Sequence, residues 1–250
     1  MSEPETNPAL TDGVLVIVER TVNPYLVCFH EPNGFRSEQI RALRNRLTVM
    51  NPDGSARSLV ITSAIQGEGK TATALNLAMS MTELQDHRIL VLDCDLRKPS
   101  VETFLGLNRG PGLADLLQGS TSLDEAIRPS GIPGLDIIGA GSRPKNPSEL
   151  AASRRVDELL GQLKEQYNYV LLDTPPIVPI SDAGILSAKS DGTLVVVALE
   201  RASRRMVKEA LEQLESVGAQ LLGTFVVGIR GADPATDERY RYTWDGEAKE

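Results

Sequence analysis

The sequence predicts an α/β fold in which helices cover both faces of a doubly wound, mostly parallel sheet. Short β-branched runs alternate with longer helical stretches along most of the chain, which is the rhythm of consecutive βαβ units. These runs are continuously apolar and do not alternate, as expected of strands that are covered on both faces. With 250 residues, 41% of them hydrophobic, the chain is long enough for one large domain of this type.

The expected elements follow from composition and spacing. Apolar, β-branched runs place the strands at residues 58–63, 88–93, 135–140, 169–173, 193–199 and 221–229. Longer stretches with helical spacing place the helices at about 70–85, 147–166, 180–189 and 201–217. A further helix begins at Arg36, where Ile40, Leu43 and Leu47 are spaced for one buried face. Residues 14–18, VLVIV, are apolar enough to add an edge strand.

The chain divides into three segments. Residues 1–35 are predicted to be a lead-in, disordered over 1–13 because that part is polar and acidic. Residues 36–230 carry the alternating pattern and form the domain. The apolar pattern stops at Gly231, so 231–250 is predicted to be a solvated, flexible tail.

Composition excludes several classes of protein. A net charge of −8 argues against nucleic acid as the main partner, because a phosphate backbone needs a basic face. The longest uncharged apolar runs are too short to cross a bilayer, and the N-terminus lacks an apolar signal core. Two cysteines, Cys28 and Cys94, give no disulfide framework. A cytoplasmic protein is the expectation.

The stretch SAIQGEGKTATALNLA, at residues 63–78, places a glycine-rich turn between a strand and a helix. A phosphate-binding P-loop needs the pattern G-x-x-x-x-G-K-[ST] in that context. Gly69, Lys70 and Thr71 occupy the last three positions, and Ala64 replaces the first glycine. The alternative is an ordinary glycine-rich turn with a surface lysine, but the strand and helix around the turn favour the phosphate loop.

Each part of the loop has an expected task in binding ATP and Mg²⁺. Gly67 and Gly69 would let backbone N–H groups turn inward around an anion, at a helix N-terminus that favours negative charge. Lys70 would reach the β- and γ-phosphates, and the Thr71 hydroxyl would join the Mg²⁺ shell. The expected nucleotide contacts come from consecutive residues, namely Gln66, Gly67, Glu68, Gly69, Lys70, Thr71 and Ala72.

Two apolar strands end in aspartate, as a P-loop site needs for its metal ion. ILVLDCDLRKP carries Asp93, Asp95 and Arg97, and YVLLDTPPI carries Asp173. Because open α/β sheets place their sites at the carboxyl ends of strands, the three aspartates are expected near Lys70. The alternative is that these aspartates form turns or cap helices.

Each aspartate has its own expected role. Asp173 is predicted to hold the metal directly or through water, and Asp93 to accept a proton from the incoming hydroxyl as general base. Asp95 would share the metal or face a neighbouring subunit. Arg97 would pair with phosphate or with Asp95, or form a surface ion pair. The catalytic candidates are Lys70, Asp93 and Asp95, and the metal candidates are Thr71, Asp95 and Asp173.

These motifs resemble those of the bacterial tyrosine kinases of exopolysaccharide and capsule synthesis. ILVLDCDLR matches the family's Walker A′ motif, hhhDxDxR, and YVLLDTPP matches its Walker B motif, hhhDTPP. Further similar stretches are GLADLLQG, NPSELAAS and ISDAGILS, at 112–119, 146–153 and 180–187. The resemblance covers about 36–230 and implies a P-loop NTPase fold that uses ATP and Mg²⁺ for protein-tyrosine phosphorylation.

The resemblance also implies a ring-shaped homo-oligomer. SEQIRALRNRL is similar to the family's E-x-x-R-x-x-R helix, with Glu38, Arg41 and Arg44, and this helix lies at the subunit interface in the family. A spacing of three places these residues on neighbouring helical positions. The alternative is an ordinary charged helix face, whose ion pairs contribute little.

In the family, tyrosines near the C-terminus of the neighbouring subunit receive the phosphate. Tyr240 and Tyr242 are the candidates here, within a polar tail that is long enough to reach a site. The alternative is a pair of exposed aromatics, or packing of Tyr242 and Trp244 against the domain.

The family kinase is fused to a membrane-spanning activator or works with a separate one. This chain resembles the separate kind, so the implied partner is a membrane-bound regulator of polysaccharide chain length. That partner would recruit the kinase to the inner face of the plasma membrane. Neither nucleic acid nor a membrane span of its own is expected.

Four positions depart from the family pattern. Gln66 stands where proline is usual, and Ala72 lacks a hydroxyl that often contacts phosphate. Val227 occupies the place of an asparagine that reads adenine, and Arg205 replaces a usual threonine. These changes bear on recognition of the base more than on binding of the triphosphate.

Two rival functions stay open on the sequence alone. A switch ATPase of the MinD/ParA kind has the same type of sheet, but it carries an early P-loop lysine where this chain has Ile65. A nucleotide-binding, non-catalytic regulator of polysaccharide assembly is the other. Lys70, Asp93 and Asp173 are all present, which favours a working phosphoryl-transfer site.

Overall fold

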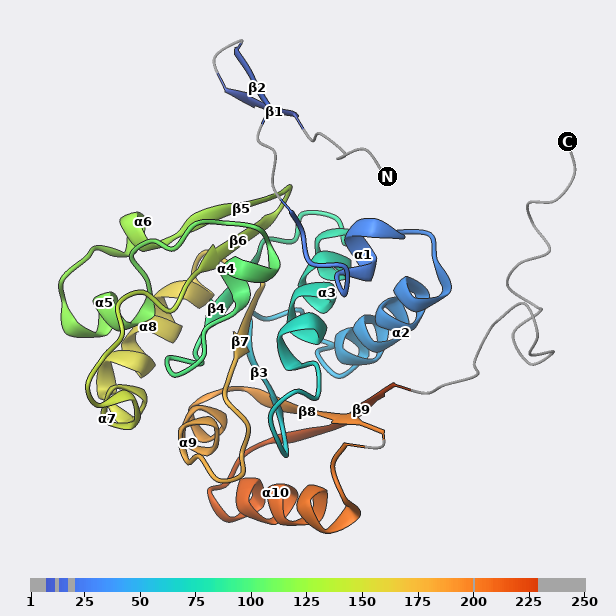
Figure 1. Cartoon of the computed structure of the whole chain (residues 1–250), viewed down its shortest axis with the longest axis vertical. Helices are drawn as coiled ribbons and strands as arrows, with labels where there is room; N and C mark the ends of the chain where they lie inside the picture. The colour runs from blue at the N-terminus through green and yellow to red at the C-terminus, as the bar shows by residue number, and fades with distance from the viewer. Residues whose placement is uncertain (1–7, 12–13, 18–20, 200, 229–250) are drawn as a thin grey trace, which may run out of the picture.

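The computed structural model describes residues 8–11, 14–17, 21–199 and 201–228. Its centre is a seven-stranded sheet in the order β5-β6-β4-β7-β3-β8-β9 (Figure 1). Neighbouring strands run parallel except for β5 and β6. The strands are β3 (Arg57–Ser63), β4 (Ile89–Asp93), β5 (Arg128–Ile132), β6 (Leu135–Ile138), β7 (Tyr169–Asp173), β8 (Gly192–Ala198) and β9 (Leu221–Val227). The predicted doubly wound fold is confirmed.

Helices cover both faces of this sheet, because successive strand residues point to opposite sides. In β3, Leu59 and Ile61 join the apolar cluster around α3, whereas Val60 joins the cluster around α8. The helices are α1 (Val27–His30), α2 (Phe35–Val49), α3 (Lys70–Thr82), α4 (Val101–Phe104), α5 (Leu113–Gln118), α6 (Leu123–Ala126), α7 (Pro147–Ala152), α8 (Arg154–Lys164), α9 (Asp182–Lys189) and α10 (Arg204–Ser216). In the described residues, no helix combines the length and the apolar character that crossing a membrane requires.

The N-terminal apolar run forms a strand, but not in the main sheet. β2 (Val14–Ile17) pairs antiparallel with β1 (Pro8–Thr11) in a separate two-stranded sheet. Residues 8–11, expected to be disordered, are therefore a strand, because a neighbouring apolar segment satisfies their backbone groups locally. Residues 14–17 therefore form the predicted strand, but it pairs with β1 and not with an edge of the main sheet.

The helix expected over 147–166 is two helices, broken at Ser153. This residue has φ −64° and ψ 150°, which is extended backbone between the end of α7 and the start of α8. The short elements α4, α5, α6 and β5 were not predicted from the sequence. They span only four to six residues each, too few to show a period.

Candidate nucleotide site

The P-loop lies between β3 and α3, at the carboxyl edge of the sheet (Figure 1). Gly67 and Gly69 have φ of +83° and +87°, a region that side chains disfavour, and they curl the backbone into the start of α3. Lys70 is buried as the first residue of that helix. The N–H groups at a helix start and the lysine together suit a phosphate.

Glu68 shapes the loop from within. Its carboxylate accepts the Ile65 N–H at 2.8 Å and the Ala198 N–H at 3.0 Å, and the residue is 1% exposed. The side chain therefore ties the P-loop to the end of β8 and does not face the phosphate space, although Glu68 was among the expected nucleotide contacts. Nothing in the local sequence signals this role, because the partner lies 130 residues away.

Asp173, at the end of β7, meets the first turn of α3. Its Oδ2 accepts the Thr71 hydroxyl at 2.5 Å, and Thr71 also contacts the Ser100 hydroxyl at 2.9 Å. Its Oδ1 is buried and has no hydrogen-bond partner among the described residues. Burial raises the pKa of Asp173 to about 7, although Thr71 and the Lys70 charge act in the opposite direction.

This arrangement fits Mg²⁺, which takes oxygen ligands and is usually held by one or two carboxylates together with phosphates and water. Thr71 supplies a hydroxyl and Asp173 supplies a carboxylate oxygen that lacks another partner. In the part of the chain that the structure describes, no three His, Cys, Asp or Glu side chains gather into a metal cluster.

Asp93 ends β4 in register with Asp173 on the adjacent strand. One of its oxygens accepts the Asp95 N–H at 3.1 Å, and the other accepts those of Ser100 and Val101 at 2.9 and 3.0 Å. Burial raises the pKa of Asp93 well above its usual value, and the Asp173 charge adds to the rise. Asp93 therefore fixes the loop after β4, which is the turn-forming and helix-capping role given above as the alternative for these aspartates.

The other charged residues after β4 point to different partners. Asp95 is half-buried, and its Oδ1 accepts the Lys98 N–H at 2.9 Å. Arg97 donates to Asp182 at 3.1 Å and to Ser148 at 3.0 Å. Arg97 is therefore paired with Asp182, which is buried at the start of α9, and not with Asp95 as one expectation had it. Pairing of Arg97 with phosphate stays a prediction.

The remaining loop residues lie at the rim. The Gln66 amide oxygen accepts a hydrogen bond from Lys98 Nζ at 3.1 Å. The Ala72 carbonyl accepts the Asn76 side chain at 2.7 Å. Val227 Cγ2 lies 4.0 Å from where a Cβ on Gly69 would stand, so the end of β9 borders the P-loop. The structure thus brings Lys70, Thr71, Asp93, Asp95 and Asp173 to one edge of the sheet.

The E-x-x-R-x-x-R residues form a cluster on α2 and α3. Arg41 pairs with Glu38 at 2.5 Å and with Glu83 at 2.7 Å, and Arg44 pairs with the other Glu83 oxygen at 2.7 Å. Arg44 also donates to the Ser80 carbonyl at 2.7 Å, near the end of α3. Within one subunit, both arginines therefore bind the end of the helix that begins at the P-loop.

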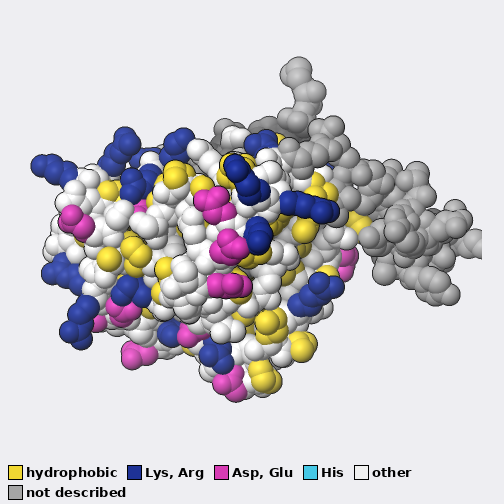
Figure 2. Space-filling view, turned by 90° about the horizontal axis from the view of Figure 1, so that it is seen from below, with side chains coloured by type: hydrophobic (Ala, Val, Ile, Leu, Met, Phe, Trp, Pro, Cys, Tyr) yellow, Lys and Arg dark blue, Asp and Glu magenta, His cyan; other side chains and the backbone are white. Residues whose placement is uncertain are grey.

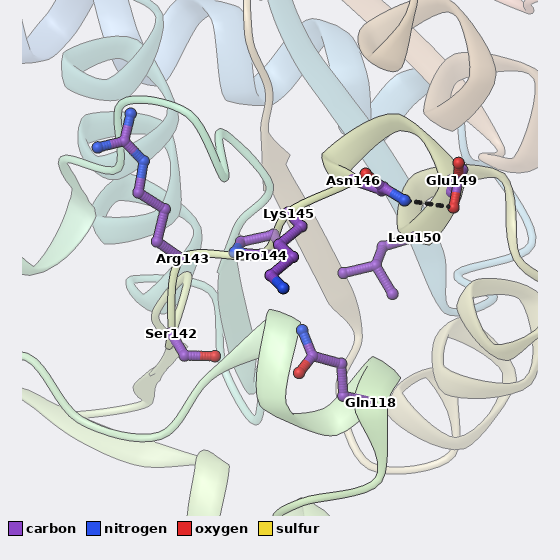
Figure 3. A pocket seen from close by; sticks show the side chains of 8 residues that line it. All are labelled: Gln118, Ser142, Arg143, Pro144, Lys145, Asn146, Glu149 and Leu150. Carbon is purple, nitrogen blue, oxygen red and sulfur yellow. Dashed lines mark hydrogen bonds between the residues drawn. The ribbon is translucent and has the colours of Figure 1, made fainter.

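A hollow of about 630 Å³ lies apart from these motifs, between α5 and the segment before α8. Lys145 points toward Gln118 in it, Arg143 extends away, and Asn146 donates to Glu149 at 2.9 Å (Figure 3). It contains none of the P-loop or strand-end aspartate residues, so the nucleotide site is elsewhere. The acceptor candidates Tyr240 and Tyr242 lie outside the described residues.

Comparison with known proteins gives consistent matches. A family model described as an AAA domain matches residues 56–225. The tyrosine-protein kinase YwqD of Bacillus subtilis is 35% identical over 81% of this chain and 85% of its own length. A putative tyrosine-protein kinase of Ralstonia solanacearum, EpsB, is 34% identical over 90% of this chain, which spans only 29% of EpsB.

Two solved structures have a similar fold. The kinase domain of the Escherichia coli tyrosine kinase ETK has a TM-score of 0.79 and 30% identity, covering 84% of this chain and 82% of that domain. MinD of Pyrococcus horikoshii with Mg-ADP has a TM-score of 0.59 and 24% identity, covering 68% and 70%. The likeness to MinD concerns the fold alone.

Proposed function

The chain belongs to the bacterial tyrosine-protein kinase family, and on that premise we propose that it transfers the γ-phosphoryl group of ATP to its own C-terminal tyrosines. The acceptors would be Tyr240 and Tyr242 of a neighbouring subunit. Phosphorylation of this tail would regulate the synthesis and export of exopolysaccharide or capsule, through a membrane-bound partner that recruits the kinase to the inner face of the plasma membrane.

The observation that carries the proposal is the convergence of two aspartate-ended strands on the P-loop. Thr71 donates to Asp173 at 2.5 Å, and Asp93 is the residue beside Asp173 in the register of β4 and β7. Binding of nucleotide and metal needs one of these strand ends, whereas phosphoryl transfer to a hydroxyl needs a further carboxylate near the acceptor, for which the loop after Asp93 supplies Asp95 as the candidate.

The chain's own residues bind and orient the nucleotide. The N–H groups of the loop around Gly67 and Gly69 surround the phosphates, and Lys70 contacts the β- and γ-phosphates. Thr71 and Asp173 would hold Mg²⁺, which neutralises phosphate charge when it is bound. Buried surroundings strengthen each of these electrostatic contacts.

Of the two candidate aspartates, Asp95 is better placed to accept the tyrosine proton than Asp93, to which the sequence analysis gave that role. Asp93 is fully buried, and three backbone N–H groups occupy its carboxylate. Asp95 is half-buried, and its Oδ2 makes no hydrogen bond to any described residue. We assign proton acceptance to Asp95 and support of its loop to Asp93.

The test is phosphosite mapping by mass spectrometry, after the purified chain has been incubated with Mg-ATP. Lys70→Met is the matched inactive control, because methionine keeps an unbranched side chain one atom shorter at this buried position and removes the charge. Asp93→Asn is a poorer control, since its amide N–H₂ would face backbone donors.

Phosphate on Tyr240 or Tyr242 that is absent from Lys70→Met supports the proposal. Steady ATP hydrolysis without phosphotyrosine, even with the cytoplasmic part of a membrane activator added, contradicts it and favours a switch ATPase. Loss of tail phosphorylation in Asp95→Asn, with nucleotide binding intact, would support the assignment of the proton acceptor.

A further inference from the structure

Arg201 lies against the P-loop from the turn that follows β8. A Cβ built on Gly67 would meet its Nη1 at 2.8 Å and its Cζ at 3.9 Å, so the guanidinium covers the outer side of that glycine. The Arg201 N–H closes a turn onto the Ala198 carbonyl at 3.2 Å, and the Ala198 N–H is bound by Glu68 of the P-loop. The backbone at the base of this side chain is therefore fixed to the loop that the guanidinium covers.

The Arg201 side chain is exposed and forms no ion pair or hydrogen bond with any described residue. Arg97, in contrast, is paired with a buried carboxylate. A planar guanidinium donates to two oxygens at once and suits phosphate better than an ammonium group does. Its position on an anion-binding loop makes a bound triphosphate the natural partner.

A second cation reaches the same part of the loop from the other side. Lys98 Nζ donates to the Gln66 side chain, so Gln66 and Gly67 are contacted by cations from the loop after β4 and the turn after β8. In the sheet, β4 and β8 flank the pair β7 and β3. Figure 2, which views the molecule from below, shows basic and acidic side chains mixed over the face that it draws.

We propose that Arg201 is a phosphate-binding catalytic residue outside both Walker motifs, and that it contacts the γ-phosphate and the oxygen between the β- and γ-phosphorus atoms. The catalytic part of this inference rests on the proposed kinase function, whereas the binding part does not. Walker loops surround the β- and γ-phosphates, and an arginine at that point stabilises the charge of phosphoryl transfer.

The step that Arg201 would assist is balanced as follows. The bond between the γ-phosphorus and the bridging oxygen breaks, and ADP keeps its electron pair. A bond forms between that phosphorus and the tyrosine oxygen, and the tyrosine proton passes to Asp95. Negative charge develops on the bridging oxygen, so a cation fixed there stabilises the transition state.

The first measurement is nucleotide affinity by calorimetry, with Mg²⁺ and either ADP or a non-hydrolysable ATP analogue. Arg201→Ala is expected to weaken the analogue roughly 10-fold, as loss of one charge-assisted contact does, and ADP less than about 2-fold. Arg204→Ala is the matched control, because it removes the same charge from an exposed position in the first turn of α10. Retained ADP binding shows that the P-loop is intact.

The second measurement is the rate of phosphotyrosine formation at saturating ATP. Arg201→Ala is expected to lower kcat by about 100-fold or more, while Arg204→Ala leaves it within about 2-fold, since arginines in this role contribute 10³–10⁵. Arg201→Lys should recover only part of the rate, because lysine cannot donate in a fork.

The outcomes separate the two proposals. If Arg201→Ala changes the affinities for ADP and for the analogue by the same factor, the proposed contact of Arg201 with the γ-phosphate is overturned. A normal rate in Arg201→Ala overturns its catalytic part while the kinase function stands. If the wild-type chain forms no phosphotyrosine, the kinase proposal fails, and the affinities alone then decide whether Arg201 binds the γ-phosphate.

Discussion

Lys70 is buried at the first position of α3, and its charge lies close enough to Asp173 to lower the pKa of that carboxyl. We expect Lys70→Met to abolish autophosphorylation, because the charge that orients the β- and γ-phosphates is lost. The measurement is phosphotyrosine formation at saturating Mg-ATP, with a thermal melt to show that the fold is kept. Normal activity in this variant would refute the phosphate-loop role.

Asp173 and Asp93 should respond in opposite directions to the same substitution. Burial raises the pKa of Asp173 from 3.8 to about 7. Keeping this carboxylate ionised in the folded protein at neutral pH therefore lowers the free energy of unfolding by at most about 4 kcal/mol. We therefore expect Asp173→Asn to stabilise the nucleotide-free protein by ~1–2 kcal/mol and to lose the extra stabilisation from Mg-ATP. The measurement is chemical denaturation at pH 7 with and without Mg-ATP.

The matched comparison is Asp93→Asn, on the neighbouring strand. Its carboxylate accepts three backbone N–H groups, so the amide should destabilise the protein by ~1–3 kcal/mol. Destabilisation of both variants by equal amounts would show that neither carboxylate is held for function.

The residues that the sequence placed correctly are those whose signal is local. Gly69, Lys70 and Thr71 follow one another, and Asp173 ends a strand whose apolar run is visible in the sequence. The Arg97 partner could not be found in this way, because Asp182 is 85 residues away and meets it only after α9 packs. The contact of the Glu68 side chain with Ala198 could not be found for the same reason.

At the scale of elements, the contact between α2 and α3 depends on Glu83, the residue after α3. Hydrogen bonds from Arg41 lower the pKa of Glu83, with a further contribution from Arg44. A lowered folded pKa means that the stabilisation is fully present above the unfolded value of about 4.3 and is lost as the pH falls through the folded value. Because the Glu83 side chain is 38% exposed, we expect only about 1 kcal/mol from both pairs.

Glu83→Gln tests this contact through its pH dependence. The variant should be less stable than the wild type at pH 7, and the difference should shrink as the pH falls below about 4.3. Urea denaturation at a series of pH values between 7 and 3 measures it, and added salt should reduce the difference at pH 7. A gap that stays constant over this range would mean that packing, and not charge, accounts for the loss.

Element boundaries show where a periodic signal stops being informative. Residues 147–166 keep a helical spacing throughout, yet the backbone is extended at Ser153 and the helix divides there. Apolar spacing does not change at the break, because α7 and α8 bury Ala151 and Val156 in the same cluster. In α7, before the break, Ser148 donates to Asp182 and accepts from Arg97.

At the scale of the whole molecule, the parallel sheet was predictable and its order was not. Continuous apolar runs indicate strands that are covered on both faces, but they do not say that β7 lies between β4 and β3. That order brings Asp93 and Asp173 side by side and places both next to the P-loop strand. The site therefore depends on pairings between segments that lie far apart in the sequence.

The last prediction concerns the proposed ring, whose expected interface residues already have partners within one subunit. Arg41 and Arg44 bind Glu83, so removing them changes both the fold and any contact with a neighbour. We expect Arg41→Ala with Arg44→Ala to shift the protein toward monomers, measured by light scattering over a range of concentrations. Glu83→Gln is the matched control, since it breaks the same internal pairs and leaves both arginines available.

If the arginines act between subunits, Glu83→Gln keeps the wild-type mass or raises it, while the double variant falls to the monomer mass. If they act only within the subunit, the two variants lose stability together and share one mass. Glu38→Gln adds a third comparison, because Glu38 is more than half exposed and pairs only with Arg41 among the described residues. A wild-type mass in the double variant, at concentrations where the wild type assembles, would contradict the interface.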